Sequence, residues 1–73
     1  MKTIKELRTE QGLTQLKVAY RIDVTPLSVS NWERGVSVPT VAKLRALARL
    51  FGVSSDDIAL MEREDSLEGK RAA

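Results

Sequence analysis

The fold of this chain is decided by residues 15–34, which read QLKVAYRIDVTPLSVSNWER. The first part carries apolar residues at helical spacing directly after Thr14, a residue type that caps helices, so we expect a helix over about 15–22. In the second part, Thr25 can cap another helix. Pro26 suits its first position, because the missing N–H has no helical partner there. The stretch therefore predicts two consecutive short helices.

The connection between these two helices has only three or four residues, so the helices must cross steeply. A close crossing needs a small residue where the backbones meet, and Ala19 supplies it. The second helix then keeps an outer face that is polar and uncharged except at its end. Because an α-helix fits the major groove of B-DNA, this pattern is typical of a helix-turn-helix. The outer face consists of Pro26, Leu27, Ser28, Ser30, Asn31 and Arg34.

Two further helices follow from the same apolar periodicity. One covers about residues 2–11 and ends at Gly12, a residue type that suits the left-handed conformation at helix ends. The other covers about residues 41–51 and ends at Gly52. Its apolar stripe consists of Val41, Leu44, Leu47, Ala48 and Phe51.

A fifth short helix is predicted from Ser54 and Asp57, which form the start signal S-x-x-D, and it runs to about Leu60. We therefore expect a compact all-α domain of five helices over residues 1–61, and an acidic, polar and disordered tail over residues 62–73. The expected core consists of Ile4, Leu7, Leu13, Val18, Ala19, Ile22, Val24, Val29, Trp32, Leu44, Leu47, Ala48, Phe51, Val53 and Ile58.

Composition excludes several classes of protein. The 73 residues contain no Cys, which excludes a disulfide scaffold, and no His, which removes the commonest acid/base group and metal ligand. No paired carboxylates or deep cleft are expected in so short a helical chain, so we predict neither enzymatic activity nor a cofactor or metal. The charged start and the lack of a long apolar run predict a cytoplasmic protein that does not contact the membrane.

The net charge of +2 is unevenly distributed. Residues 1–53 hold nine basic and four acidic residues, a net charge of +5, whereas residues 54–73 hold three basic and six acidic residues, a net charge of −3. A basic body of this kind favours a polyanionic partner.

Several spaced motifs occur in one order along the chain. They are IKELR (4–8), GLTQ (12–15), VT (24–25), VSNWERG (29–35), Pro39, LA (47–48) and FGVS (51–54). Together they resemble the phage-repressor or Cro-type helix-turn-helix family, also called the XRE family, over about residues 3–60. The resemblance implies a lambda-repressor-like domain whose second and third helices form the helix-turn-helix.

What the resemblance implies about function is sequence-specific binding of duplex DNA by a transcription regulator without cofactor. Such a regulator binds an inverted-repeat operator as a homodimer and represses by excluding polymerase, or activates from an adjacent site. Base reading falls to Pro26, Leu27, Ser30 and Asn31, and Gln15 is implied to contact either a base edge or the phosphate beside it. Contacts to the DNA backbone fall to Thr25, Ser28, Arg34, Ser37, Val38, Thr40 and Lys43. An ion pair is expected between Arg8 and Glu33, and we expect dimer contacts at Ile58, Leu60 and Met61.

The sequence departs from the family pattern at three positions of the motif. Asp23 stands where relatives usually have Gly in a left-handed turn, which Asp tolerates at some cost. Pro26 and Leu27 replace the Gln, Arg or Ser that relatives often have. Leu27 can contact a thymine methyl group and Asn31 suits adenine, but the Arg that most often reads guanine is missing.

Other interpretations remain open for several of these residues. Trp32 fits the core or a stacking platform, Ser30 and Asn31 fit a solvated surface, and Arg34 fits charge compensation at a helix end. Leu16 and Tyr20 lie four residues apart on the outside of the 15–22 helix. They form either a simple surface pair or a patch that contacts another protein. The alternative function is therefore a protein-interaction module, an antitoxin-like or adaptor domain, that uses the Leu16/Tyr20 face or the fifth helix to bind a second protein.

Overall fold

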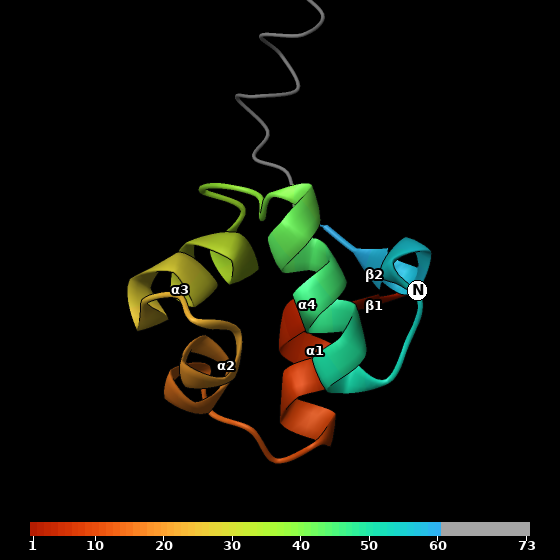
Figure 1. Ribbon diagram of the computed structural model, residues 1–73, viewed down its shortest axis with the longest axis horizontal. Helices are drawn as coiled ribbons and strands as arrows, with labels where there is room; N and C mark the ends of the chain where they lie inside the picture. Colours follow the sequence, from red (N-terminus) through yellow and green to blue (C-terminus); the bar gives the residue numbers. More distant parts are fainter. Residues whose placement is uncertain (61–73) are drawn as a thin grey trace, which may run out of the picture.

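Four α-helices and a small parallel sheet make up residues 1–60, which are the residues that the computed structural model describes. The pair α2 and α3 lies on one side of α1 and α4, and the sheet lies on the other side (Figure 1). In chain order the elements are β1 (Lys2–Thr3), α1 (Ile4–Glu10), α2 (Gln15–Ile22), α3 (Pro26–Arg34), α4 (Val41–Phe51), the 3-10 turn η1 (Ser55–Asp57) and β2 (Ile58–Ala59).

Threonine side chains start all four α-helices. Each hydroxyl accepts a hydrogen bond from the backbone amide three residues further on, which satisfies one of the free amides of the first turn. These N-caps are Thr3, Thr14, Thr25 and Thr40. In α1 the Glu6 carboxylate also accepts from the Thr3 amide at 2.9 Å, which completes a capping box.

Left-handed residues end three of the helices. Gly35 and Gly52 do so at φ values of 75° and 74°, as expected from their positions. Asp23 does so after α2 with φ 59° and ψ 53°, and it is the only non-glycine residue with positive φ among residues 1–60. The left-handed turn between α2 and α3 therefore forms at Asp23, although relatives usually have glycine at this position.

The core agrees closely with the expected set. Buried side chains are Ile4, Leu7, Val18, Ala19, Ile22, Val29, Trp32, Leu47, Ala48, Phe51 and Ile58. The other expected residues, Leu13, Val24, Leu44 and Val53, are partly buried and pack against these. The assignment of Val41 to the apolar stripe of α4 is wrong. Val41 is the first residue of the helix, and 66% of it is exposed.

The predicted fifth helix is wrong. The Ser54 hydroxyl does accept from a backbone amide, that of Asp56, but only the three residues of η1 are helical. The chain then extends, and Ile58 and Ala59 pair in parallel with Lys2 and Thr3. This pairing buries the β-branched Ile58, which is 4% exposed, and it also explains why α1 begins at residue 4 rather than 2.

Two earlier predictions concern residues outside the described part of the chain. The tail over residues 62–73 and the dimer contact at Met61 both lie there. Among residues 1–60, no helix has the length and apolar character needed to cross a membrane.

Candidate nucleic-acid interface

Two residues of α3 belong to the core, and the others lie at or near the surface. Val29 and Trp32 point inward, with exposed fractions of 0% and 7%, which excludes Trp32 as a stacking platform. Spacings of three and four residues place four of the other side chains of α3 on one face. We call this the reading face, and it consists of Leu27, Ser30, Asn31 and Arg34.

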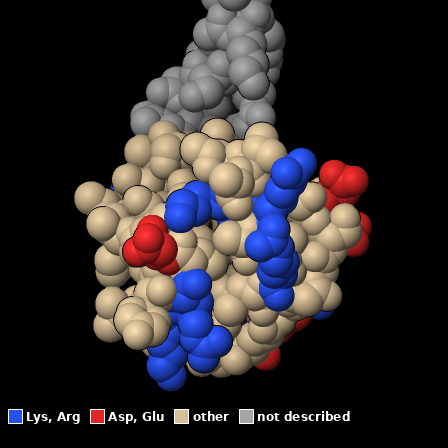
Figure 2. All heavy atoms as spheres, in the orientation of Figure 1, with Lys and Arg blue, Asp and Glu red and all other residues tan. Residues whose placement is uncertain are grey.

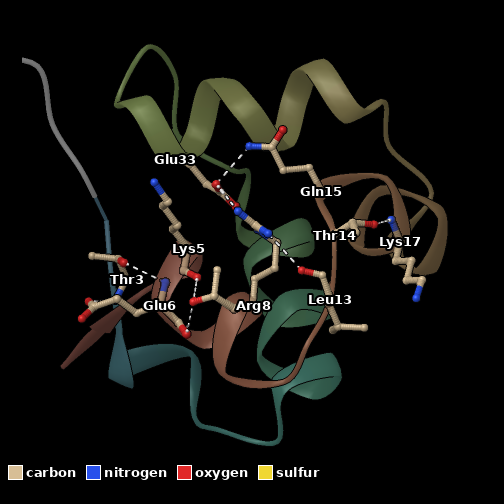
Figure 3. Close-up of polar contacts among 10 residues, drawn as sticks. Thr3, Lys5, Glu6, Arg8, Leu13, Thr14, Gln15, Lys17 and Glu33 are labelled. Atoms are coloured by element: carbon tan, nitrogen blue, oxygen red, sulfur yellow. Dashed lines mark hydrogen bonds and ion pairs between the residues drawn. The ribbon is translucent and has the colours of Figure 1, made fainter.

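An ion pair ties α1 to the reading helix. Arg8 Nε donates to Glu33 Oε2 at 2.7 Å, and Arg8 Nη2 donates to Glu33 Oε1 at 3.0 Å (Figure 3). Arg8 Nη1 also donates to the backbone oxygen of Leu13 at 2.9 Å. Because the side chains of Arg8 and Glu33 are only 13% and 4% exposed, water competes little for this pair. The expected bracing of α3 by α1 is thus present in the structure.

The electrostatics of Glu33 reflect these contacts. Burial by itself raises the pKa of the Glu33 carboxyl, but hydrogen bonds from Arg8 and Gln15 and the positive charge of Arg8 outweigh it. The net result is a pKa below the ordinary glutamate value, so Glu33 is ionised at neutral pH. The same pair raises the pKa of Arg8, chiefly through the hydrogen bond to Glu33.

Gln15 also contacts Glu33, which sequence reasoning missed. Its Nε2 donates to Glu33 Oε1 at 3.0 Å, and its amide oxygen points away from the carboxylate (Figure 3). The first residue of α2 is therefore fixed to the end of α3. The side chain stays half-buried at the interface edge, with the oxygen and the second N–H left for a ligand.

Asn31 and Arg34 contact each other on the reading face. Arg34 Nη2 donates to Asn31 Oδ1 at 2.6 Å, an exposed contact one turn apart. The backbone oxygen of Asn31 additionally accepts from Val36 at 2.9 Å, which fixes the position of the residue. Pro26 is exposed at the start of α3, and Leu27 next to it is 64% exposed.

The residues predicted to contact the DNA backbone fall into two groups. The Thr25 hydroxyl already caps α3 and lies 3.1 Å from the hydroxyl of Ser28, while the Ser37 amide donates to Asn31 at 3.4 Å. The amides of Val38 and Thr40, by contrast, donate to no acceptor within residues 1–60. The amides just before α4 are thus the better placed of the two groups to bind phosphate.

Lys43 contacts the end of α2, which its predicted place at the DNA backbone does not account for. Its Nζ donates to the backbone oxygens of Ile22 at 2.9 Å and Asp23 at 3.4 Å. These are carbonyls at the end of α2, where a positive charge is favourable because of the helix dipole. Lys43 therefore joins α4 to the turn of the helix-turn-helix, and only its third N–H is left for phosphate. A contact twenty residues away carries no local sequence signal.

Basic side chains gather beside the reading face rather than on it. Figure 2 shows Lys and Arg over α2 and along α4, with an acidic group over the connection from α2 to α3. On the reading face Arg34 is the one cation. The four residues of this face therefore carry a single charged side chain.

Of the two predicted dimer-contact residues that lie within residues 1–60, Leu60 is at the surface, with 39% exposed. Ile58 belongs to the core instead, because its strand pairs with β1. A second apolar surface lies on α2, where Leu16 and Tyr20 are 66% and 85% exposed. We call Leu16 and Tyr20 the α2 patch.

Comparison with known proteins agrees with this geometry. The profile of the family described as helix-turn-helix matches residues 4–58. The HTH-type transcriptional activator BcrR of Enterococcus faecalis is 31% identical over 55 residues, which are 75% of this chain and 27% of that protein. The chain thus spans about a quarter of the length of this relative. No solved structure matches the present chain significantly. The chain belongs to the phage-repressor or Cro-type (XRE) helix-turn-helix family of DNA-binding transcription regulators.

Proposed function

We propose that this chain binds duplex DNA sequence-specifically by placing α3 in the major groove. The observation that carries the proposal is the reading face, whose four side chains are not among the buried core residues and lie on a helix braced by the Arg8–Glu33 ion pair. An α-helix fills the major groove, where each base pair presents a distinct set of donors, acceptors and methyl groups. Leu27 supplies apolar contact suited to a thymine methyl, and Ser30 and Asn31 supply hydrogen bonds.

The backbone contacts that position α3 come from its surroundings. Gln15 at the start of α2 and the free amides of Val38 and Thr40 before α4 can hold phosphates on either side of the groove. Arg34 and the third N–H of Lys43 add positive charge there. Since few cations are directed to phosphate, we expect moderate affinity for each protomer.

The regulatory consequence depends on where the operator lies. A bound domain that overlaps a promoter excludes polymerase and represses transcription, and a domain bound beside polymerase can activate through a protein contact. We propose repression through operator occupation, with two protomers on an inverted repeat and Leu60 at their interface. A sedimentation experiment with and without operator DNA tests the dimer, and a monomer in both cases contradicts it.

The DNA-binding proposal is tested by fluorescence anisotropy of labelled duplexes at about 50 mM and 200 mM salt. Each phosphate neutralised adds about 0.9 to the slope of log affinity against log salt. We expect binding that weakens clearly with salt, and a smaller slope for Arg34→Ala. Leu16→Ala is the control, because it removes exposed apolar surface without changing charge. Affinity that is absent, or independent of salt, contradicts the proposal.

The alternative function, a protein-interaction module, is favoured by one observation. Leu16 and Tyr20 form an exposed apolar pair on α2, and large apolar side chains together on a surface often mark a protein contact. If the chain shows no salt-sensitive binding to duplex DNA, and Tyr20→Ala abolishes its binding to a partner protein, the chain acts as an adaptor instead.

A further inference from the structure

We propose that the acidic segment 62–68 of this chain docks into a shallow hollow between α2 and α4. The hollow measures about 370 Å³ and is lined by Arg21, Ile22, Ala46, Arg49 and Leu50. Its two arginines come from the last turns of the two helices. We call it the α2/α4 hollow, and the proposed contact of α3 with DNA makes no use of its residues.

The α2/α4 hollow combines apolar surface with two cations. Ile22 is 6% exposed, and Ala46 and Leu50 are partly buried residues that pack against the core. Arg21 and Arg49 are exposed, and neither takes part in an ion pair within residues 1–60. Such a surface suits a ligand that carries carboxylates next to an apolar side chain, because a guanidinium group binds carboxylates through several N–H donors.

The two helices that form the hollow have no acidic residue of their own. Figure 2 shows the basic side chains over α2 and along α4, with uncharged surface between them. These helices are 8 and 11 residues long and hold five cations, namely Lys17, Arg21, Lys43, Arg45 and Arg49. The reading face has one cation, Arg34, so the α2/α4 hollow attracts an acidic segment more strongly.

This chain itself carries a ligand of the required chemistry. Residues 62–68 read EREDSLE, with four acidic residues and one basic residue, a net charge of −3. Their one large apolar residue is Leu67, which has Asp65 two residues before it and Glu68 directly after it. The segment therefore matches the hollow in sign of charge and in its apolar centre, with Leu67 against Ile22 and the carboxylates toward the arginines.

The segment is long enough to reach the hollow. Leu60 follows β2, whose sheet lies on the side of α4 away from α2 (Figure 1). The path crosses the width of α4, about 10–12 Å, and follows at most its 11 residues, about 16 Å, which together give about 20 Å because the two displacements are perpendicular. The seven residues from Leu60 to Leu67 span up to about 23 Å. Tethering also supplies an effective concentration on the order of 1 mM, so weak contacts are enough for docking.

The test places a spin label beside the acidic segment of the full chain. Because the chain has no cysteine, Gly69→Cys supplies a single site for a nitroxide label. The broadening that this label causes is read from the backbone amide signals in NMR spectra of the isotope-labelled protein. We expect the amides of residues 21–22 and 46–50 to lose most of their intensity, and those of β1 to lose less. At about 1 M salt, where the Debye length is about 3 Å, this selective loss should diminish.

A matched pair of variants tests the arginines of the hollow. Arg21→Gln combined with Arg49→Gln is expected to abolish the selective broadening. Lys17→Gln combined with Arg45→Gln removes the same charge from the same helices, but outside the lining of the hollow, and should retain the broadening. The dispersion of the amide signals checks in each case that the domain is folded.

A second pair of variants changes only the segment and leaves residues 1–60 as they are. Asp65→Asn combined with Glu68→Gln should abolish the selective broadening, whereas Glu62→Gln combined with Glu64→Gln should retain most of it. The inference is overturned if the broadening is centred on β1 and Leu60, or if the two variants of a pair behave alike. It is also overturned if the broadening arises only between an isotope-labelled chain and a separate spin-labelled chain, because the contact then joins two copies.

Discussion

Arg8 of α1 and Glu33 of α3 form a two-bond ion pair in which both side chains are largely withdrawn from water. Glu33 immediately precedes Arg34 and lies two residues after Asn31, so the pair holds the helix that carries the reading face. Gln15 shares the same carboxylate and brings the start of α2 into the arrangement. One glutamate therefore connects three helices at the proposed interface.

Neutralising Glu33 is expected to destabilise the domain strongly. Glu33→Gln leaves the Arg8 guanidinium and the Gln15 amide directed at an amide instead of a carboxylate. Weakening this largely shielded pair is expected to cost about 1–3 kcal/mol. Glu10→Gln is the matched control, because its pair with Lys2 is half-exposed and worth less than about 1 kcal/mol. Urea unfolding measures both, and equal losses contradict the importance assigned to burial.

The stability of the domain should fall in acid, and Glu33 should account for part of the fall. Because the folded-state pKa of Glu33 is lowered, its contribution is complete above the unfolded-state value of about 4.5 and is lost as pH falls through the folded-state pKa. We expect the urea midpoint of the wild-type chain to drop below about pH 4.5. The curve of Glu33→Gln should be flatter there, whereas two parallel curves would argue against this linkage.

Lys43 should contribute to stability as well as to DNA affinity. Lys43→Met removes the hydrogen bonds to the carbonyls of Ile22 and Asp23 while keeping an apolar stem, and we expect a loss of about 1 kcal/mol. Arg45→Met on the exposed side of α4 is the control and should change stability by less than about 0.5 kcal/mol. An unchanged urea midpoint for Lys43→Met, together with weaker DNA binding, would assign this side chain to phosphate alone.

Leu27 and Leu16 provide a matched test of which surface meets DNA. Both are leucines about two-thirds exposed, Leu27 on α3 at 64% and Leu16 on α2 at 66%. Leu27→Ala is expected to reduce discrimination at one base pair by about 1–3 kcal/mol, because contact with a thymine methyl is lost. Leu16→Ala should leave DNA binding unchanged. Competition binding with single-substitution duplexes measures both, and the reverse pattern would place the interface on α2.

The helices were predictable from sequence because their signals are local. Thr14, Thr25 and Gly35 set helix ends through contacts within four residues, and apolar spacing identified the core. The predicted fifth helix failed for the opposite reason. Ser54 is a genuine cap, but Ile58 gains more from pairing with β1, some 56 residues away, than from continuing a helix.

The candidate site was predictable to a similar degree. The outward residues of α3 follow from helical spacing, and they lie where spacing places them. The contacts from Gln15 to Glu33 and from Lys43 to the end of α2 depend on how distant helices cross, which no short motif encodes. The contact between Arg34 and the Asn31 amide depends on side-chain rotamers, which the residue types alone do not fix.

Selection of duplexes from a random pool by the wild-type chain tests the central claim most directly. If α3 reads bases in the major groove, repeated rounds at about 150 mM salt return one short enriched motif that is protected from chemical modification on its major-groove edge. A pool that stays unenriched, while the chain still binds DNA in a salt-dependent way, would show that α3 reads no sequence.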